Sequence, residues 1–504
     1  MTANRQSTSM AFHRSQPQPS SLQFPVPNFQ FPVSSFGAQR PREACGVFGI
    51  YGHPEAAQIV YFGLYALQHR GQESAGIAVH RDRRIYAHKG MGLVPEVFDE
   101  AHLSELGGGS AIGHVRYSTT GGSILANAQP LAVQHRGKFY AVAHNGNLVN
   151  AHILRARLEE KGSIFQTTMD SEIFLHLLVK SLDQGLDRAL VEIVGQLRGA
   201  YSLVALGSRG EVIGIRDPNG FRPLCLGRLN GHWVLASESC ALDLIQAEHI
   251  RELDPGEIVV IDENGPRSIR TPAADPESLC IFEYIYFARP DSTIRERNVY
   301  LMRKAFGRRL AQESPVAADL VMPFPDSGNY AAIGYSEASG IPFEMGMIRN
   351  HYIGRTFIQP TQSMRDFGVR VKLNPVKELL QGKDIIIIED SIIRGTTART
   401  RVRALRELGV KRVHMRISCP PHRFPCHYGI DFSTRGELIA AKKRVAELRD
   451  FLGLDSLHYL SIAGMLAATG IDSPQQVFCK ACFDGCYPVD FDANLTKDCL
   501  EVGA

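Results

Sequence analysis

Apolar residues in the second half of the chain follow the pattern of a parallel sheet. Residues 385–388 are four consecutive isoleucines, a run typical of a strand buried on both faces. Further strands are predicted at 320–322, followed by a helix ending near Ser339, and at 413–417. Between the strands at 385–388 and 413–417, apolar residues recur at the spacing of a helix that ends at Gly409. They are Ala398, Val402, Leu405 and Leu408. This alternation predicts an α/β domain with a parallel sheet.

The first half has short apolar runs separated by tight turns. Turn signals stand at Arg81-Asp82-Arg83, Arg136-Gly137 and Asn230-Gly231. Strands are predicted at 46–51, 75–80, 85–88, 131–133, 139–143, 201–206, 212–215 and 233–236. Helices are predicted at 55–67, 149–161, 171–182 and 187–197. Hairpins with segregated helices predict a layered α+β domain.

Composition separates a leader from the ordered chain. Residues 1–44 hold six prolines, seven serines and one acid, Glu43, so we expect a disordered segment. From residue 45 the strand pattern begins. We therefore predict a leader at 1–44, domains at 45–272 and 273–490, and a tail at 491–504. The leader resembles a transit peptide only faintly, because it shows no amphipathic helix.

Charge and cysteine content limit the class of protein. The chain has 504 residues, 44% hydrophobic and 21% charged, with a net charge of +3. This balance gives no reason to expect nucleic acid or a membrane surface as partner, and no apolar run approaches a spanning helix of about 20 residues. Ten cysteines without a secretory signal favour a reducing, cytoplasmic setting, in which grouped cysteines indicate metal binding or catalysis.

Two carboxylates, Glu389 and Asp390, directly follow the isoleucine strand. The carboxyl ends of parallel strands are where open α/β sheets bind ligands. Gly395, Thr396 and Thr397 then begin the next helix, where free N–H groups favour a phosphate. Taken together, acids that can bind sugar hydroxyls and a loop that can bind a phosphate suit a ribose phosphate. Taken one at a time, the same residues are explained as an acidic strand end followed by a helix with a threonine cap.

This run resembles the phosphoribosyl pyrophosphate (PRPP) motif of type I phosphoribosyltransferases, with Glu389 in place of a more usual Asp. The resemblance implies Mg²⁺, with Ser327, Glu389 and Asp390 associated with the metal-bound substrate. Asp326 and Ser327 match the family's pyrophosphate loop. A basic segment from Gly354 to Lys372 resembles a loop that closes over PRPP, and Lys372 is the expected pyrophosphate contact.

Cys45 stands where the leader ends and the first strand begins. A lone cysteine there is most often a core residue. If the leader is removed, however, Cys45 carries a free α-amine with a pKa of about 7.7–8.0, which can accept the thiol proton. Nucleophile and base would then share one residue.

Four motifs in this half resemble the class II glutamine amidotransferases, which are N-terminal nucleophile (Ntn) hydrolases with a layered αββα fold. The motifs begin at Cys45, Gln68, His114 and His144. The resemblance implies that Cys45 attacks glutamine and that Asn145 and Gly146 form the oxyanion hole. It also assigns the substrate carboxylate to Arg116, the substrate amine to Asp170 and a supporting role to Arg70.

Cys479 and Cys482 form a Cys-x-x-Cys pair, which alone fits a zinc half-site, a redox pair or chance. Four thiolates are needed for a closed zinc or iron–sulfur site. Some two-domain proteins with these halves carry a [4Fe–4S] cluster. Their cysteine pattern matches Cys280, Cys426, Cys479 and Cys482, and resemblance therefore implies a structural cluster. Cys486 departs from that pattern, which has a basic residue there.

Both halves in this order resemble glutamine-dependent pentosyltransferases that begin purine nucleotide synthesis. The resemblance implies that ammonia from glutamine displaces pyrophosphate from PRPP, giving phosphoribosylamine. It also implies a homotetramer, or a dimer, that purine nucleotides inhibit. A sugar-phosphate aminotransferase would lack the motif at Glu389, and a regulator that only senses PRPP would not need Cys45. The intact halves favour the enzyme.

Overall fold

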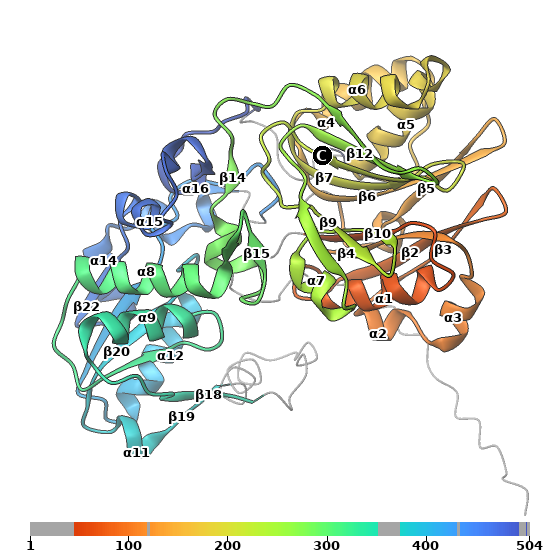
Figure 1. Ribbon diagram of the computed structural model, residues 1–504. Coiled ribbons are helices and arrows are strands. Elements are labelled where there is room, and N and C mark those ends of the chain that lie inside the picture. The colour runs from red at the N-terminus through yellow and green to blue at the C-terminus, as the bar shows by residue number, and fades with distance from the viewer. Residues whose placement is uncertain (1–44, 118–120, 351–372, 431–433, 493–499, 501–504) are drawn as a thin grey trace, which may run out of the picture. The chain divides into compact units, whose positions relative to one another are not determined.

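The computed structural model describes residues 45–117, 121–350, 373–430, 434–492 and 500. Its first half contains two antiparallel sheets (Figure 1). The first sheet has the order β11 (Glu248–Glu252), β9 (Cys225–Leu229), β10 (His232–Ala236), β1 (Gly46–Ile50), β4 (Ser110–Arg116), β2 (Ser74–Arg81) and β3 (Arg84–Met91). The second has the order β13 (Gly265–Arg270), β12 (Glu257–Asp262), β8 (Val212–Arg216), β7 (Gly199–Leu206), β6 (Lys138–Leu148) and β5 (Leu131–His135).

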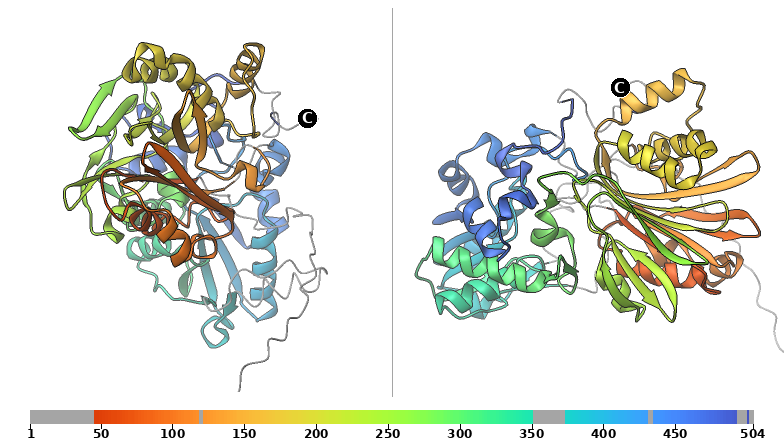
Figure 2. Two further views of the ribbon diagram at one scale, coloured as in Figure 1. Left: turned by 90° about the vertical axis from the view of Figure 1, so that its right-hand side faces the viewer. Right: turned by 45° about the horizontal axis from the view of Figure 1, so that its top comes forward.

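Helices cover the outer face of each sheet, which gives the expected αββα layers (Figures 1 and 2). Helices α1 (Ala56–Ala66), α2 (Val94–Val97) and α7 (Ser239–Leu244) pack on the first sheet, and α3 (Glu100–Glu105) follows α2. Helices α4 (Ala151–Glu160), α5 (Ser171–Ser181) and α6 (Leu186–Gln196) belong to the second. A third apolar core, which includes Val47, Ile112, Ala143 and Val204, joins the sheets to each other. Strands β1 and β6 therefore lie face to face.

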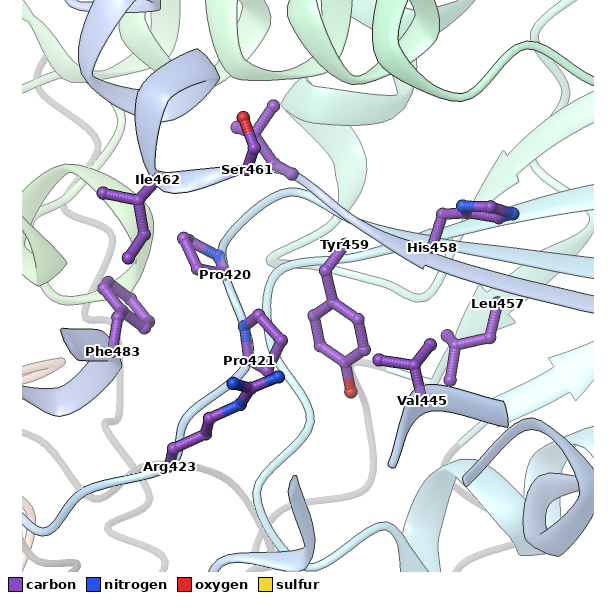
Figure 3. Close-up of a pocket in the computed structure, with 11 residues that line it drawn as sticks. Pro420, Pro421, Arg423, Val445, Leu457, His458, Tyr459, Ser461, Ile462 and Phe483 are labelled. Atoms are coloured by element: carbon purple, nitrogen blue, oxygen red, sulfur yellow. The ribbon is translucent and has the colours of Figure 1, made fainter. Parts of the chain in front are cut away.

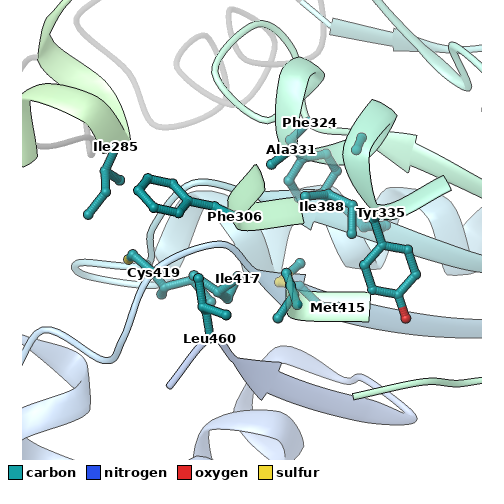
Figure 4. Close-up of a cluster of buried hydrophobic side chains, with 14 of the residues drawn as sticks. Ile285, Phe306, Phe324, Ala331, Tyr335, Ile388, Met415, Ile417, Cys419 and Leu460 are labelled. Carbon is teal, nitrogen blue, oxygen red and sulfur yellow. The ribbon is translucent and has the colours of Figure 1, made fainter. Parts of the chain in front are cut away.

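The second half is built on a four-stranded parallel sheet. Its order is β17 (Leu320–Pro323), β20 (Asp384–Glu389), β21 (Arg412–Ile417) and β22 (Ser456–Tyr459). The four isoleucines of β20 are 0% exposed, as expected for a strand with both faces covered. The core around them includes Phe306, Met415 and Leu460 (Figure 4).

Helices connect and flank these strands. They are α8 (Val299–Glu313), α9 (Asn329–Ser339), α11 (Lys377–Leu380), α12 (Thr396–Glu407), α13 (Ile439–Lys442), α14 (Val445–Leu452), α15 (Ile462–Ala468) and α16 (Ala481–Asp484). Three small sheets complete this half: β14 (Leu279–Cys280) with β23 (Phe478–Cys479), β15 (Thr293–Ile294) with β16 (Arg297–Asn298), and β18 (Met347–Arg349) with β19 (Leu373–Pro375). Both predicted fold classes are confirmed, and no helix of the described ranges is long and apolar enough to span a membrane.

The predicted turns are confirmed in detail. Asp82 and Arg83 have φ of 51° and 60°, and Asn230 and Gly231 have φ of 48° and 93°. Two consecutive positive φ angles are the type I′ geometry that matches the twist of a hairpin. In the first half, the strand predictions missed β4, β9, β11, β12 and β13. In the second half, they missed β22 and the strands of the three small sheets.

Candidate functional site

Cys45 lies immediately before β1 and is 4% exposed. Its Sγ is 3.3 Å from the Tyr117 carbonyl oxygen, to which it donates, and the Tyr117 N–H lies 3.5 Å from the sulfur. Burial raises the pKa of the thiol, although Tyr117 and the positive charge of Arg116 oppose the shift. A thiol with a raised pKa stays protonated near pH 7, so this cysteine needs a base in order to react.

Asn145 and Gly146 lie on β6, which packs against β1. Gly146 has φ of 148°, and a Cβ there would lie 2.0 Å from the Ala200 carbonyl oxygen, so only glycine fits. The Asn145 side chain is 0% exposed, and neither its Oδ1 nor its Nδ2 has a partner among the residues that the structure describes. A buried amide without partners is costly to keep and is typical of a binding site.

Arg116 and Asp170 are also buried beside Cys45, close enough that their charges act on the pKa of its thiol. Arg116 donates through Nη1 to the Gly122 carbonyl and through Nη2 to the Gly121 carbonyl, both at 3.1 Å. Asp170 Oδ2 accepts from the Leu148 N–H at 2.8 Å. Burial would raise the pKa of Asp170, but nearby His144 and these hydrogen bonds hold it below its usual value. Both side chains are therefore fixed in position and charged.

Arg70 is completely buried and donates from Nε to the carbonyl oxygen of Cys45 at 3.1 Å. Two carboxylates, Glu238 and Glu283, bind its guanidinium. The structure thus brings together Cys45 and Arg70, the expected supporting residue.

The predicted PRPP residues meet at the carboxyl ends of the adjacent strands β17 and β20. The Phe324 N–H donates to the Ile388 carbonyl at 2.9 Å, and a Cβ on Gly328 would lie 2.3 Å from that oxygen. This close approach brings the loop of Asp326 and Ser327 against Glu389 and Asp390.

Several polar atoms at this edge are available for a ligand. Ser327 Oγ and Asp390 Oδ2 are buried and have no partner within the described ranges, whereas Asp390 Oδ1 accepts from Ser391 Oγ at 2.6 Å. Gly395, with φ of 73°, precedes α12, and Thr396 and Thr397 form its first turn. The arrangement suits a phosphate at the helix N-terminus and a sugar or cation at the acids.

Four cysteines from distant segments line one cavity between β14, β23 and α16. Strands β14 and β23 pair Cys280 with Cys479, and Cys426 and Cys482 complete the set. Burial raises the pKa of each thiol, that of Cys280 to about 11, while the guanidinium of Arg222 opposes the shift at Cys280. Cys486 is exposed and does not line this cavity.

A larger cavity of about 390 Å³ lies beside β22 (Figure 3). Tyr459, Pro420, Pro421, Arg423 and Phe483 are among the side chains around it. None of the predicted site residues lines it, so it does not belong to either predicted site.

Three relevant charged residues were absent from the prediction. Glu283 and Arg222 connect Arg70 to the cysteine cavity, and Arg401 lies 3.5 Å from Glu389 Oε2. Isolated charged residues have no periodicity or motif that marks them, so only the fold could reveal these pairs. Lys372, the rest of the basic segment from Gly354, and the leader lie outside the described residues.

Comparisons with known proteins agree with this geometry. Residues 114–244 match the family model described as a glutamine amidotransferase domain. The chain is 53% identical over 465 residues to the amidophosphoribosyltransferase of Synechocystis sp., covering 91% of this chain and 93% of that protein. It is 49% identical over 452 residues to that of Bacillus subtilis, covering 89% and 94%. A chloroplastic amidophosphoribosyltransferase of Glycine max is 50% identical over 454 residues, covering 90% and 79%.

Solved structures give the same result. The glutamine PRPP amidotransferase of Bacillus subtilis, complexed with ADP and GMP, matches with a TM-score of 0.85 and 47% identity, covering 91% of this chain and 100% of that one. A structure described as the allosteric regulatory enzyme of purine biosynthesis matches with a TM-score of 0.86 and 47% identity, covering 90% and 98%. The predicted function is confirmed: the chain belongs to the amidophosphoribosyltransferase family, the glutamine-dependent enzymes that catalyse the first step of purine biosynthesis.

Proposed function

We propose that Cys45 is the nucleophile of the glutamine half-reaction. Its sulfur attacks the side-chain amide of glutamine, ammonia leaves, and water then releases glutamate from the thioester. Asn145 Nδ2 and the Gly146 N–H donate to the oxygen that becomes negative during the attack. Arg116 binds the substrate carboxylate and Asp170 the substrate amine. The observation that carries this assignment is the buried amide of Asn145, whose polar atoms have no partner within the described ranges.

The base in this proposal is the α-amine of Cys45, which becomes free only when residues 1–44 are removed. The raised pKa of the thiol supports the need for a base. An amine with a reference pKa of about 7.7–8.0 is partly neutral near pH 7 and lies within the same residue.

In the phosphoribosyl half, Glu389 and Asp390 hold the ribose hydroxyls, and Gly395, Thr396 and Thr397 bind the 5′-phosphate. Asp326, Ser327 and Lys372 belong to the pyrophosphate end. Ammonia attacks the anomeric carbon while pyrophosphate leaves. Ser327 Oγ and Asp390 Oδ2, which have no partner among the described residues, support this assignment.

Mg²⁺ is the expected metal of this site, and it would neutralise charge on the leaving pyrophosphate. Ser327, Glu389 and Asp390 would hold it together with the substrate. Within the described ranges, no group of three or more His, Cys, Asp and Glu side chains could hold a metal ion. Mg²⁺ is usually bound through one or two carboxylates plus substrate phosphates rather than a cage of protein ligands, so its site would be complete only with PRPP bound.

We also propose a structural [4Fe–4S] cluster on Cys280, Cys426, Cys479 and Cys482. All four side chains line one cavity, and four cysteine thiolates are the ligand set of such a cluster. Anaerobically purified protein should be brown and contain iron. A colourless protein, or one with stoichiometric zinc, would refute this assignment.

Assembly and regulation complete the proposal. We place the domains at 45–272 and 273–490, between a cleaved leader and a tail at 491–504, and expect a cytoplasmic homotetramer. Purine nucleotides are the expected inhibitors, which the ADP and GMP bound to the Bacillus subtilis relative support.

One experiment separates the two half-reactions. Pyrophosphate release from PRPP is measured with glutamine or with ammonium, for the wild type and for Cys45→Ala. The variant should lose the glutamine-dependent reaction and retain the ammonium-dependent one, because added ammonia bypasses the first site. Equal loss of both reactions in a folded Cys45→Ala protein would contradict two separate sites.

A further inference from the structure

Four buried charged side chains form one connected network beside the glutamine site. Arg70 donates from Nη2 to Glu283 Oε1 at 2.8 Å and from Nη1 to Glu283 Oε2 at 3.0 Å. Arg222 donates from Nη1 to the same Glu283 Oε1 at 2.9 Å. Glu238 is the second carboxylate on Arg70. The four residues are each at most 1% exposed, and their two positive and two negative charges balance.

One end of this network holds the backbone of Cys45. The Nε of Arg70 donates to the Cys45 carbonyl, while both of its terminal nitrogens are bound by carboxylates. A guanidinium with every nitrogen engaged has little freedom to move. The orientation of Cys45 therefore depends on Glu283, although 238 positions separate them in the chain.

The other end reaches the proposed oxyanion hole. Arg222 Nη2 donates to the Tyr428 carbonyl at 3.0 Å. Gly429 follows, and a Cβ on it would lie 3.2 Å from the Gly146 carbonyl carbon. On the other side of Tyr428, the His427 carbonyl accepts from Asn147 Nδ2 at 2.8 Å. Segment 427–429 thus packs against the residues that directly follow Asn145.

We propose that Glu283 is a positioning residue for the glutamine half-reaction. It holds Arg70 against Cys45 and Arg222 against segment 427–429, so that one carboxylate fixes the nucleophile relative to the oxyanion hole. Misplacement of reacting groups by about 1 Å can slow a reaction about 100-fold. The proposal rests on the assignment of Cys45 and Asn145 made above. The competing explanation is that Glu283 only balances buried charge.

The first test is Glu283→Gln, which keeps the size of the side chain but loses its charge. We expect kcat for glutamine hydrolysis to fall at least about 10-fold. KM for glutamine should change less than about threefold, because Glu283 contacts neither Arg116 nor Asp170 in the described structure. The ammonium-dependent reaction, measured on the same preparation, should stay within about twofold of the wild type.

A second variant, Glu283→Gln with Arg222→Met, separates positioning from charge balance. It leaves Arg70 paired with Glu238, so the buried charges again cancel, and its melting temperature should rise above that of the single variant. Glutamine kcat should nevertheless remain low, because the link to segment 427–429 is gone. Recovery of both melting temperature and kcat would overturn the proposal.

Glu257→Gln is a matched control. Glu257 is also 0% exposed and accepts two hydrogen bonds of 2.7 Å from Arg251. It begins β12 in the second sheet, whereas β1 belongs to the first. Glu257→Gln should lower the melting temperature without changing the ratio of glutamine-dependent to ammonium-dependent rate.

If Cys45→Ala retains glutamine activity, the proposed function fails. If Cys45→Ala is inactive with glutamine but Glu283→Gln keeps the wild-type ratio, only the role of Glu283 fails.

Discussion

Replacing Asn145 with alanine should separate stability from catalysis, because stability is expected to be kept while catalysis falls. The amide is fully buried, and neither of its polar atoms has a partner among the described residues. Burying such a group costs about 1–3 kcal/mol, and its removal relieves that cost while leaving a small cavity. We therefore expect the free energy of unfolding of Asn145→Ala to lie within about 1 kcal/mol of the wild type, or above it.

Catalysis should suffer strongly. Loss of one oxyanion-hole donor typically lowers kcat by about 10²–10³-fold, or about 2.7–4 kcal/mol of transition-state stabilisation. Glutaminase kcat should fall by this factor, whereas the ammonium-dependent reaction should not change. Steady-state glutaminase assays and denaturant unfolding of the same preparation measure both quantities.

Asn127→Ala is the matched control for stability. Asn127 is equally buried, but its Nδ2 donates to the Gly122 carbonyl and to Thr168 Oγ1, each at 2.9 Å. Its removal should cost about 1–3 kcal/mol. If Asn145→Ala is destabilised as much as Asn127→Ala, or loses both half-reactions equally, Asn145 is a structural residue and the reasoning is wrong.

Three further predictions concern the phosphoribosyl site, a buried histidine and the leader. Asp390→Asn should lower the formation of phosphoribosylamine from PRPP about 100-fold with either glutamine or ammonium, because a charge beside the ribose and metal is lost; an unchanged rate with ammonium would contradict its role. His422 is buried between Phe282 and Phe483, and burial lowers its pKa to about 3. The stability that its neutral form provides is therefore present above pH 6.5 and is lost as pH falls. Between pH 7 and pH 5, His422→Phe should lose about 2 kcal/mol less of its free energy of unfolding than the wild type, measured by denaturant unfolding. Amino-terminal sequencing of active enzyme should begin at Cys45, and active enzyme that retains residues 1–44 would refute leader removal.

The sequence predicted those features that depend on neighbouring residues. The isoleucines of β20, the glycine before α12 and the I′ turns each carry a local signal, and the structure has them where expected. Motif resemblance identified Asn145 and Gly146. The close approach of Gly146 to Ala200 explains why glycine is needed there.

Features that depend on distant residues were missed. Strand β12 pairs with β8, and its apolar run 258–261 gave no hairpin signal with β8 because 40 residues lie between Arg216, which ends β8, and Glu257, which begins β12. The bridge from Arg70 to Arg222 through Glu283 likewise joins three distant segments. Such contacts follow from packing of the whole fold, which no local pattern encodes.

The most direct test of Cys45 is covalent labelling by a glutamine analogue with a diazoketone in place of the amide. Such a reagent alkylates the nucleophile that attacks the amide carbon. Intact mass and peptide mapping should find one label per chain, on Cys45, together with loss of the glutamine-dependent reaction and retention of the ammonium-dependent one. A label on another residue, or full glutamine activity in enzyme labelled at Cys45, would contradict its role as the nucleophile.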